Sequence, residues 1–281
     1  MSDGTVRGRF ITFEGPDGSG KSTQIRFLQR RLRQAGLKVI QTREPGGTVL
    51  GKHLRTLLLD ARGMRLSPRA EAMLLSADRA QHVTRVIEPA LTSGSIVVCD
   101  RYVDSTIAYQ GYGSGLPVGE LESLSEVATG GLMPDLTILI DVTTEIGLAR
   151  RRASHRTQAG ELNRLDRRDR AYHERVREGY LMIARMHRER VVLVDGTQPP
   201  EQVFARIWSS VVGLLSSPRA AGASISATQL PFSAQGAVMA LPSQTRRSRS
   251  QDVPTPRDRR GRWTRPAPID RDSGLFVQSG P

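Results

Sequence analysis

Eight residues near the start of the chain have the types and spacing needed to bind phosphate. They are Gly15, Pro16, Asp17, Gly18, Ser19, Gly20, Lys21 and Ser22, and they match the pattern G-x-x-x-x-G-K-S. Glycines let the backbone curl so that its N–H groups point inward, toward an anion. The pattern therefore predicts a P-loop for the phosphates of a nucleotide, with Lys21 as a catalytic cation and Ser22 as a ligand of Mg²⁺. An ordinary glycine-rich turn is the weaker alternative.

Polar residues also follow two later apolar runs. Asp100 and Arg101 come directly after the run 96–99, and Arg43 follows the run 39–42. Ligands of open α/β sheets bind at the carboxyl ends of the strands, so these residues are candidates for a second anion site. Arginine can clamp a phosphate with two parallel hydrogen bonds, and Asp100 can hold Mg²⁺ or its waters. The alternatives are a structural Asp–Arg pair and, for Arg43, a surface position in a Pro-Gly turn.

The elements that must position these residues alternate between apolar runs and helical patterns. We expect strands at Phe10–Phe13, Val39–Thr42, Ile96–Cys99, Leu136–Ile140 and Val191–Val194. Helical spacing of apolar residues follows the P-loop, extends from about residue 68 to 91, and recurs after Pro199 and Pro200. Buried strands separated by helices predict a parallel sheet covered on both faces, which is the three-layer α/β fold of P-loop NTPases.

An arginine-dense segment, residues 150–169, reads "RRRASHRTQAGELNRLDRRD". Arginine is the side chain best suited to neutralise the charge on a phosphoryl group in transfer. The centre of the segment is polar, contains glycine and has little apolar pattern, as a mobile lid would. We therefore predict a lid; a solvated charged helix surface and a nucleic-acid patch are the alternatives.

The net charge is concentrated in two parts of the chain. The formal charge is +13; residues 150–190 hold 13 arginines against 6 acidic residues, and residues 218–281 hold 10 arginines against 4 aspartates. The second segment is rich in Pro, Ser, Gly and Arg and has no sustained period, so it is predicted to be a disordered tail. Nucleic-acid contact by this tail is possible in principle, but a solvated tail is the favoured interpretation.

Location is predicted from what the sequence lacks. It has no run of 18 apolar residues, no apolar stretch typical of a signal peptide at its start, and one cysteine, Cys99. We expect a cytoplasmic protein that does not associate with membranes. Cys99 falls within an expected strand and is interpreted as a core residue.

Four stretches in this order, "FEGPDGSGKSTQ", "TREPGGT", "DRYVDSTIAYQG" and "NRLDRRD", resemble the bacterial thymidylate kinases. The resemblance covers roughly residues 9–215. It implies transfer of the γ-phosphate of ATP to dTMP with Mg²⁺, on a P-loop α/β fold that forms a homodimer. The domains are then a flexible N-terminus (1–8), a P-loop nucleoside monophosphate kinase domain (9–216) and the basic tail (217–281).

The resemblance also assigns residues to dTMP. Those implied are Asp17, Arg43, Arg79, Arg101, Tyr109 and Gln110. Arg101 and Arg43 would hold the phosphate, Asp17 would lie near the sugar 3′-hydroxyl, and Tyr109 would close off the space that a ribose 2′-hydroxyl needs. Arg79 would bond the thymine edge. Some relatives stack an aromatic ring on the base near Leu75; here Leu75 could form an apolar wall, or Tyr102, Tyr109 or Tyr112 could stack.

Gly18 stands where some thymidylate kinases carry an arginine that reaches the transferring phosphoryl group. Because the transition state needs a cation beyond Lys21 and Mg²⁺, the arginine-dense segment is expected to supply it. The candidates are Arg152, Arg156 and Arg164. By the same reasoning, an arginine introduced at Gly18 is expected to compensate partly for the loss of a lid arginine.

Two other functions stay open on the sequence. One is a different P-loop nucleoside or nucleoside monophosphate kinase. The other is a nucleic-acid-binding protein that uses the P-loop as a nucleotide-dependent switch. Arg101 and the run "STIAYQ" favour a kinase, because a switch does not require them.

Overall fold

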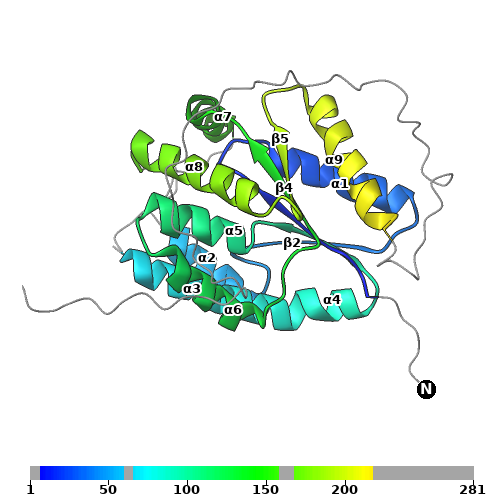
Figure 1. The fold of residues 1–281 in the computed structure, drawn as a ribbon, viewed down its shortest axis with the longest axis horizontal. Helices are drawn as coiled ribbons and strands as arrows, with labels where there is room; N and C mark the ends of the chain where they lie inside the picture. Colours follow the sequence, from blue (N-terminus) through cyan, green and yellow to red (C-terminus); the bar gives the residue numbers. More distant parts are fainter. Residues whose placement is uncertain (1–6, 60–65, 158–167, 218–281) are drawn as a thin grey trace, which may run out of the picture. The chain divides into compact units, whose positions relative to one another are not determined.

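The structure is a computed structural model, which describes residues 7–59, 66–157 and 168–217 and, for residues 154–157, the helix but not the side chains. Five strands form one parallel sheet in the order β2-β3-β1-β4-β5 (Figure 1). They are β1 (Phe10–Glu14), β2 (Val39–Arg43), β3 (Ile96–Asp100), β4 (Leu136–Asp141) and β5 (Val191–Asp195). The predicted α/β fold with a parallel sheet is confirmed.

Each strand continues one residue beyond the predicted apolar run. The added residues are Glu14, Arg43, Asp100, Asp141 and Asp195. Backbone pairing carries on past the predicted runs: Arg43 pairs with Asp100, and Asp141 pairs with Asp195. The carboxyl edge of the sheet therefore carries a charged residue on every strand, which is the edge where α/β proteins bind ligands.

The helices lie between consecutive strands, except α9, which follows β5. They are α1 (Lys21–Gln34), α2 (Val49–Leu59), α3 (Pro68–His82), α4 (Glu88–Thr92), α5 (Val103–Thr106), α6 (Val118–Thr129), α7 (Thr144–Thr157), α8 (Arg170–Met186) and α9 (Pro200–Leu215), with π-helical segments η1 (Val83–Ile87) and η2 (Ile107–Gly113). No helix among the described residues is long and apolar enough to cross a membrane.

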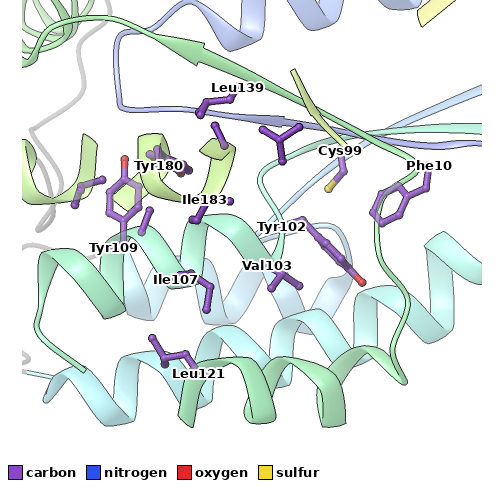
Figure 2. Close-up of a cluster of buried hydrophobic side chains, with 14 of the residues drawn as sticks. Phe10, Cys99, Tyr102, Val103, Ile107, Tyr109, Leu121, Leu139, Tyr180 and Ile183 are labelled. Carbon is purple, nitrogen blue, oxygen red and sulfur yellow. The ribbon is translucent and has the colours of Figure 1, made fainter. Parts of the chain in front are cut away.

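Helices cover both faces of the sheet. On one face of the sheet lie α1 and α9 (Figure 1). Their apolar residues, such as Leu28 and Ile207, share a core cluster with Ile11 and Val98. On the other side of the sheet, Phe10 and Cys99 belong to a core cluster with side chains from α3, η1, α4, α5, η2, α6 and α8. Figure 2 shows this second cluster, with Tyr102 beside Phe10. Cys99 is fully buried and burial raises the pKa of its thiol, as expected of an unreactive core residue.

The helical stretch expected over residues 68–91 contains a π-helical segment. The chain runs from α3 through the π-helical η1 into α4 without leaving the helical conformation, so the predicted helical stretch is confirmed, with a π-helical turn inside it. Pro89 gives the physical reason: it has no N–H to donate, and its ring crowds the carbonyl of residue 85. The turn widens just before the proline, and α4 ends at Thr92.

Candidate active site

The predicted P-loop lies between β1 and α1, as its motif requires. Gly15, Gly18 and Gly20 have φ values of 133°, 79° and 101°, which favour glycine. Lys21 is buried, and its ammonium donates to Gly15 O at 2.9 Å and Pro16 O at 3.1 Å. Backbone N–H groups at the start of a helix, together with its positive dipole end, attract anions, so the site combines backbone donors with a cation.

Two of these glycines are also required by close backbone contacts. A Cβ on Gly15 would lie 2.2 Å from Ile140 O, and a Cβ on Gly18 would lie 2.2 Å from Gly147 O on α7. The contact is mutual, since a Cβ on Gly147 would lie 2.7 Å from Asp17 O. An arginine at position 18 therefore does not fit this backbone. The expected rescue by Gly18→Arg is withdrawn for that reason.

Arg101 lies against the P-loop. Its Nη2 donates to Asp17 Oδ1 at 2.8 Å and to Tyr109 Oη at 3.1 Å, and Nη1 donates to Gly15 O at 3.3 Å. Tyr109 Oη in turn donates to Asp17 Oδ2 at 3.0 Å. Burial would raise the pKa of Asp17, but the charges of Arg101 and Lys21 outweigh it and hold that pKa below its usual range. Arg101, Asp17 and Tyr109, three of the predicted site residues, thus form one hydrogen-bonded cluster.

The structure is compatible with Mg²⁺ at the predicted ligands. Asp100 Oδ1 is buried and has no hydrogen-bond partner among the described residues, so an acceptor is left over at the end of β3. Ser22 is exposed in the first turn of α1. In the described part of the chain, no group of three or more His, Cys, Asp or Glu could hold a metal by itself. This donor set suits an ion that keeps waters and phosphate oxygens as ligands, as Mg²⁺ does.

A further arginine, which the sequence reasoning missed, lies near Arg43. Arg55 on α2 donates from Nη1 to Pro45 O at 3.0 Å. Burial and the charge of Arg43 lower its pKa, and the charge of Arg101 acts in the same direction. Arg43 is exposed at the end of β2. No motif marks Arg55; only its place on the first helix after "TREPGGT" could have suggested it.

Arg79 is buried in a network at the other end of the site. Its Nε donates to Glu44 Oε2 at 2.8 Å, and Nη2 donates to Thr106 Oγ1 at 2.9 Å. Its Nη1 has no hydrogen-bond partner among the described residues. Gln110 is similar: Nε2 donates to Glu71 Oε1 at 2.6 Å, and Oε1 has no partner within the described ranges. Each side chain is held in place with one polar atom left over.

Two of the three aromatic candidates for base stacking, Tyr102 and Tyr109, have rings that contact other side chains. Tyr102 lies in the core, edge-on to Phe10, and its hydroxyl donates to Leu132 O at 3.1 Å. The Tyr109 ring is covered by the Arg101 guanidinium at 4.9 Å from its centroid. Leu75 on α3 is half-buried. Tyr102 is thus unsuited to stacking, and Leu75 fits the role of an apolar wall.

The arginine-dense segment begins on α7. Arg150 donates from Nη1 to Gly196 O at 2.9 Å, and Arg152 is exposed. Burial has the largest effect on the pKa of Asp17 and raises it, whereas the charges of Arg101 and Lys21 lower it. The charge of Arg151 also lowers this pKa, by less than either of them. The side chain of Arg156 and all of Arg164 lie outside the described residues. The structure therefore adds Arg151 as a cation that acts on the P-loop.

A P-loop with the Arg101 guanidinium bonded to it is the arrangement expected of a P-loop kinase, which brings two phosphate-bearing ligands together. The chain belongs to the thymidylate kinase family: the family model "Thymidylate kinase" matches residues 13–207. A thymidylate kinase of Thermomicrobium roseum is 52% identical over 206 residues, which cover 73% of this chain and 95% of that protein. One from Desulfovibrio desulfuricans is 49% identical over 208 residues, with 73% and 96% covered.

The solved structures agree. The crystal structure of thymidylate kinase from Ehrlichia chaffeensis matches with a TM-score of 0.58 and 32% sequence identity, over 73% of this chain and 99% of that one. The resemblance seen in the sequence motifs is confirmed, and so is the P-loop NTPase fold.

Proposed function

We propose that the protein transfers the γ-phosphoryl group of ATP to a phosphate oxygen of dTMP, which yields ADP and dTDP. The observation that carries the proposal is the position of Arg101, whose guanidinium bonds both the P-loop carbonyl of Gly15 and the side chain of Asp17. A phosphate held by Arg101 is therefore next to a phosphate held by the P-loop. Membership of the thymidylate kinase family supports the same reaction.

In the proposed mechanism, the amides of the P-loop and of the start of α1 bind the ATP phosphates. The Lys21 ammonium moves from the carbonyls of Gly15 and Pro16 to the β- and γ-phosphates. Bound Mg²⁺ would supply charge neutralisation between these phosphates, with Ser22 and Asp100 as its protein ligands, directly or through water. The reacting oxygens are aligned rather than chemically activated, because phosphoryl transfer depends mainly on positioning and charge.

At the acceptor side, Arg101 and Arg43 bind the dTMP phosphate, and Arg55 adds positive charge beside them. Asp17 accepts from the sugar 3′-hydroxyl. Tyr109 is fixed by its bond to Asp17 and fills the space of a 2′-hydroxyl.

The spare atoms of two buried side chains match the thymine base. Thymine O4 is an acceptor and N3–H is a donor. Arg79 Nη1 can donate to the first and Gln110 Oε1 can accept from the second. A base that lacks the matching acceptor or donor would leave these buried atoms without a hydrogen bond. Such a base would therefore bind more weakly than thymine.

A substrate panel tests the function. ADP release is measured with dTMP, dUMP, UMP, CMP and thymidine as acceptors. We expect dTMP to give the highest kcat/KM. Turnover of none of the five would overturn the kinase proposal, and preference for another acceptor would make the chain a different nucleoside or nucleotide kinase.

We also propose that the protein works as a homodimer through α2 and α3. Of the apolar residues on α2, only Leu58 is fully buried, whereas Val49 and Leu50 are 74% and 46% exposed. Met73 on the adjoining α3 is 56% exposed. A second copy of the chain would cover this surface.

Sedimentation analysis tests the dimer. Leu50→Glu should shift the protein to a monomer, whereas Leu193→Glu, at an exposed site on the edge strand β5, should not. A wild-type protein that sediments as a monomer overturns this part of the proposal. Cytoplasmic location and the role of the basic tail, which lies outside the described residues, stay predictions.

A further inference from the structure

The backbone at Arg101 is strained. Arg101 has a φ of 74°, and it is the one non-glycine residue with positive φ in the described part of the chain. A long side chain avoids this region unless neighbouring contacts enforce it. Two hydrogen bonds do so here: Arg101 N donates to Phe13 O at 3.0 Å, and Tyr102 N donates to Glu14 Oε1 at 2.7 Å.

Glu14 also acts on the side chain of Arg101, through two hydroxyl groups. Its Oε2 accepts from Ser105 Oγ at 2.6 Å and from Tyr180 Oη at 3.1 Å. Arg101 Nη1 in turn donates to the same oxygens, Ser105 Oγ at 3.2 Å and Tyr180 Oη at 2.9 Å. A hydroxyl has one hydrogen, so a hydroxyl that gives it to Glu14 presents only lone pairs to the guanidinium.

We propose that Glu14 is the positioning residue for Arg101. Its two carboxylate oxygens have different partners. Oε1 holds the strained backbone after Arg101, and Oε2 orients the hydroxyls of Ser105 and Tyr180 as acceptors for the guanidinium. Glu14 itself is fully buried, and its carboxylate accepts from Tyr102 N and from the two hydroxyls. The proposal rests on the proposed function, in which Arg101 holds the dTMP phosphate.

Three variants separate the parts of this arrangement. Ser105→Ala and Tyr180→Phe each remove one oriented hydroxyl and leave Glu14 in place. Glu14→Gln keeps an oxygen for Tyr102 N but turns an NH₂ group toward the hydroxyls, which reverses their orientation. Ser125→Ala is the matched control, because it removes a buried serine hydroxyl on α6 that has no bond to Arg101.

KM for dTMP, KM for ATP and kcat are measured for each variant, together with the thermal midpoint. Ser105→Ala and Tyr180→Phe should each raise KM for dTMP about 3- to 10-fold, the effect of losing one hydrogen bond of typical strength that positions Arg101. In these two variants KM for ATP should change less than about twofold. Ser125→Ala should change neither KM for dTMP nor KM for ATP. Glu14→Gln should give the largest rise in KM for dTMP.

A combined variant gives a readout that a merely structural role would not produce. In the Ser105→Ala/Tyr180→Phe background, Glu14→Gln has no hydroxyls left to reorient, so its further effect on KM for dTMP should be much smaller than in the wild type. An undiminished effect in that background would overturn the proposal, and so would equal rises in both KM values. If Glu14→Gln does not fold, Ser105→Ala and Tyr180→Phe still test the proposal, because each must raise KM for dTMP more than KM for ATP. A wild-type protein that fails to turn over dTMP would instead overturn the proposed function.

Discussion

Two carboxylates flank Arg101, and their pKa values move in opposite directions. Asp17 bonds the guanidinium directly and lies near Lys21, and these charges overcome the effect of burial and hold its pKa low. Glu14 lies deeper; burial first, and then the charge of Asp104, raise its pKa to about 7. One arginine is thus held between an acid that stays ionised and an acid that can take up a proton near neutral pH.

The high pKa of Glu14 predicts how stability depends on pH. Between the ordinary value of 4.5 and about 7, the folded state binds a proton that the unfolded state does not. Stability from this group is therefore complete below pH 4.5 and is lost as the pH rises toward 7. Besides burial and the charge of Asp104, the charge of Arg101 and the hydrogen bonds from Ser105 and Tyr102 act on the pKa of Glu14, and these three lower it. Glu14 in turn acts on the pKa values of Lys21, Arg79, Cys99, Tyr180 and Arg190.

We expect the thermal midpoint of the wild type to fall, between pH 5.5 and 7.5, by several degrees more than that of Glu14→Gln, which cannot ionise. Scanning calorimetry at the two pH values measures the difference. Parallel changes in the two proteins would show that the titration of Glu14 is not coupled to folding.

Tyr109 predicts the choice of sugar. Its side chain is buried, and its hydroxyl is fixed by Asp17 and Arg101, so it cannot move aside for a 2′-hydroxyl. Tyr109→Ala should erode the preference for dTMP over ribothymidine monophosphate, which differs only at that hydroxyl. The ratio of the two kcat/KM values measures the effect, with Tyr112→Phe as a control on the same π-helical segment. An unchanged ratio would exclude this role for Tyr109.

At the scale of elements, the sequence predicts what is local. Apolar runs located all five strands to within one residue, and the P-loop spacing located the start of α1. Contacts between segments far apart in the sequence were not predictable in this way. The Gly18–Gly147 contact joins the P-loop to α7, and nothing in either segment's own pattern indicates it. Arg55 and Glu14 were missed for the same reason, because their roles depend on partners that other loops bring to them.

The packing of α7 on the P-loop bears on the lid arginines. Because Gly18 has no side chain, a cation for the transition state has to come from elsewhere, and α7 begins in backbone contact with the loop. Arg152→Ala or Arg156→Ala, at least one of them, should lower kcat by about 100-fold with little change in either KM. Arg151→Ala should also raise KM for dTMP, since Arg151 acts on Asp17.

Steady-state kinetics of single variants, including Arg164→Ala, measures these effects, and Arg33→Ala on the exposed side of α1 is the control. Losses below about tenfold for every arginine of the segment, or ~1.4 kcal/mol, would mean that the segment does not supply the charge. Gly18→Arg should not restore activity to any of them, because Gly147 O occupies the space that its Cβ needs.

At the scale of the whole molecule, the family match and the described fold end close together. The family model ends at residue 207, and α9, the last described helix, ends at Leu215. Ser217 still belongs to the packed body, since Arg9 Nη2 donates to its hydroxyl at 3.0 Å. Residues 218–281 hold 10 of the arginines and none of the proposed site residues.

A chain cut after Ser217 is therefore expected to keep kcat and both KM values within a few-fold of the full-length protein. The matched control is a chain cut after Arg206, which loses Ile207, Trp208, Val211 and Leu215 from the core between α9 and the sheet. Burial of such side chains contributes about 1.5–3 kcal/mol each, comparable in total to the whole stability of a domain, so the shorter chain should fail to fold. Circular dichroism and the ADP-release assay on both proteins measure the outcome. If the chain cut after Ser217 also unfolds or loses its activity, residues beyond it belong to the catalytic domain, and the boundary at 216 is wrong.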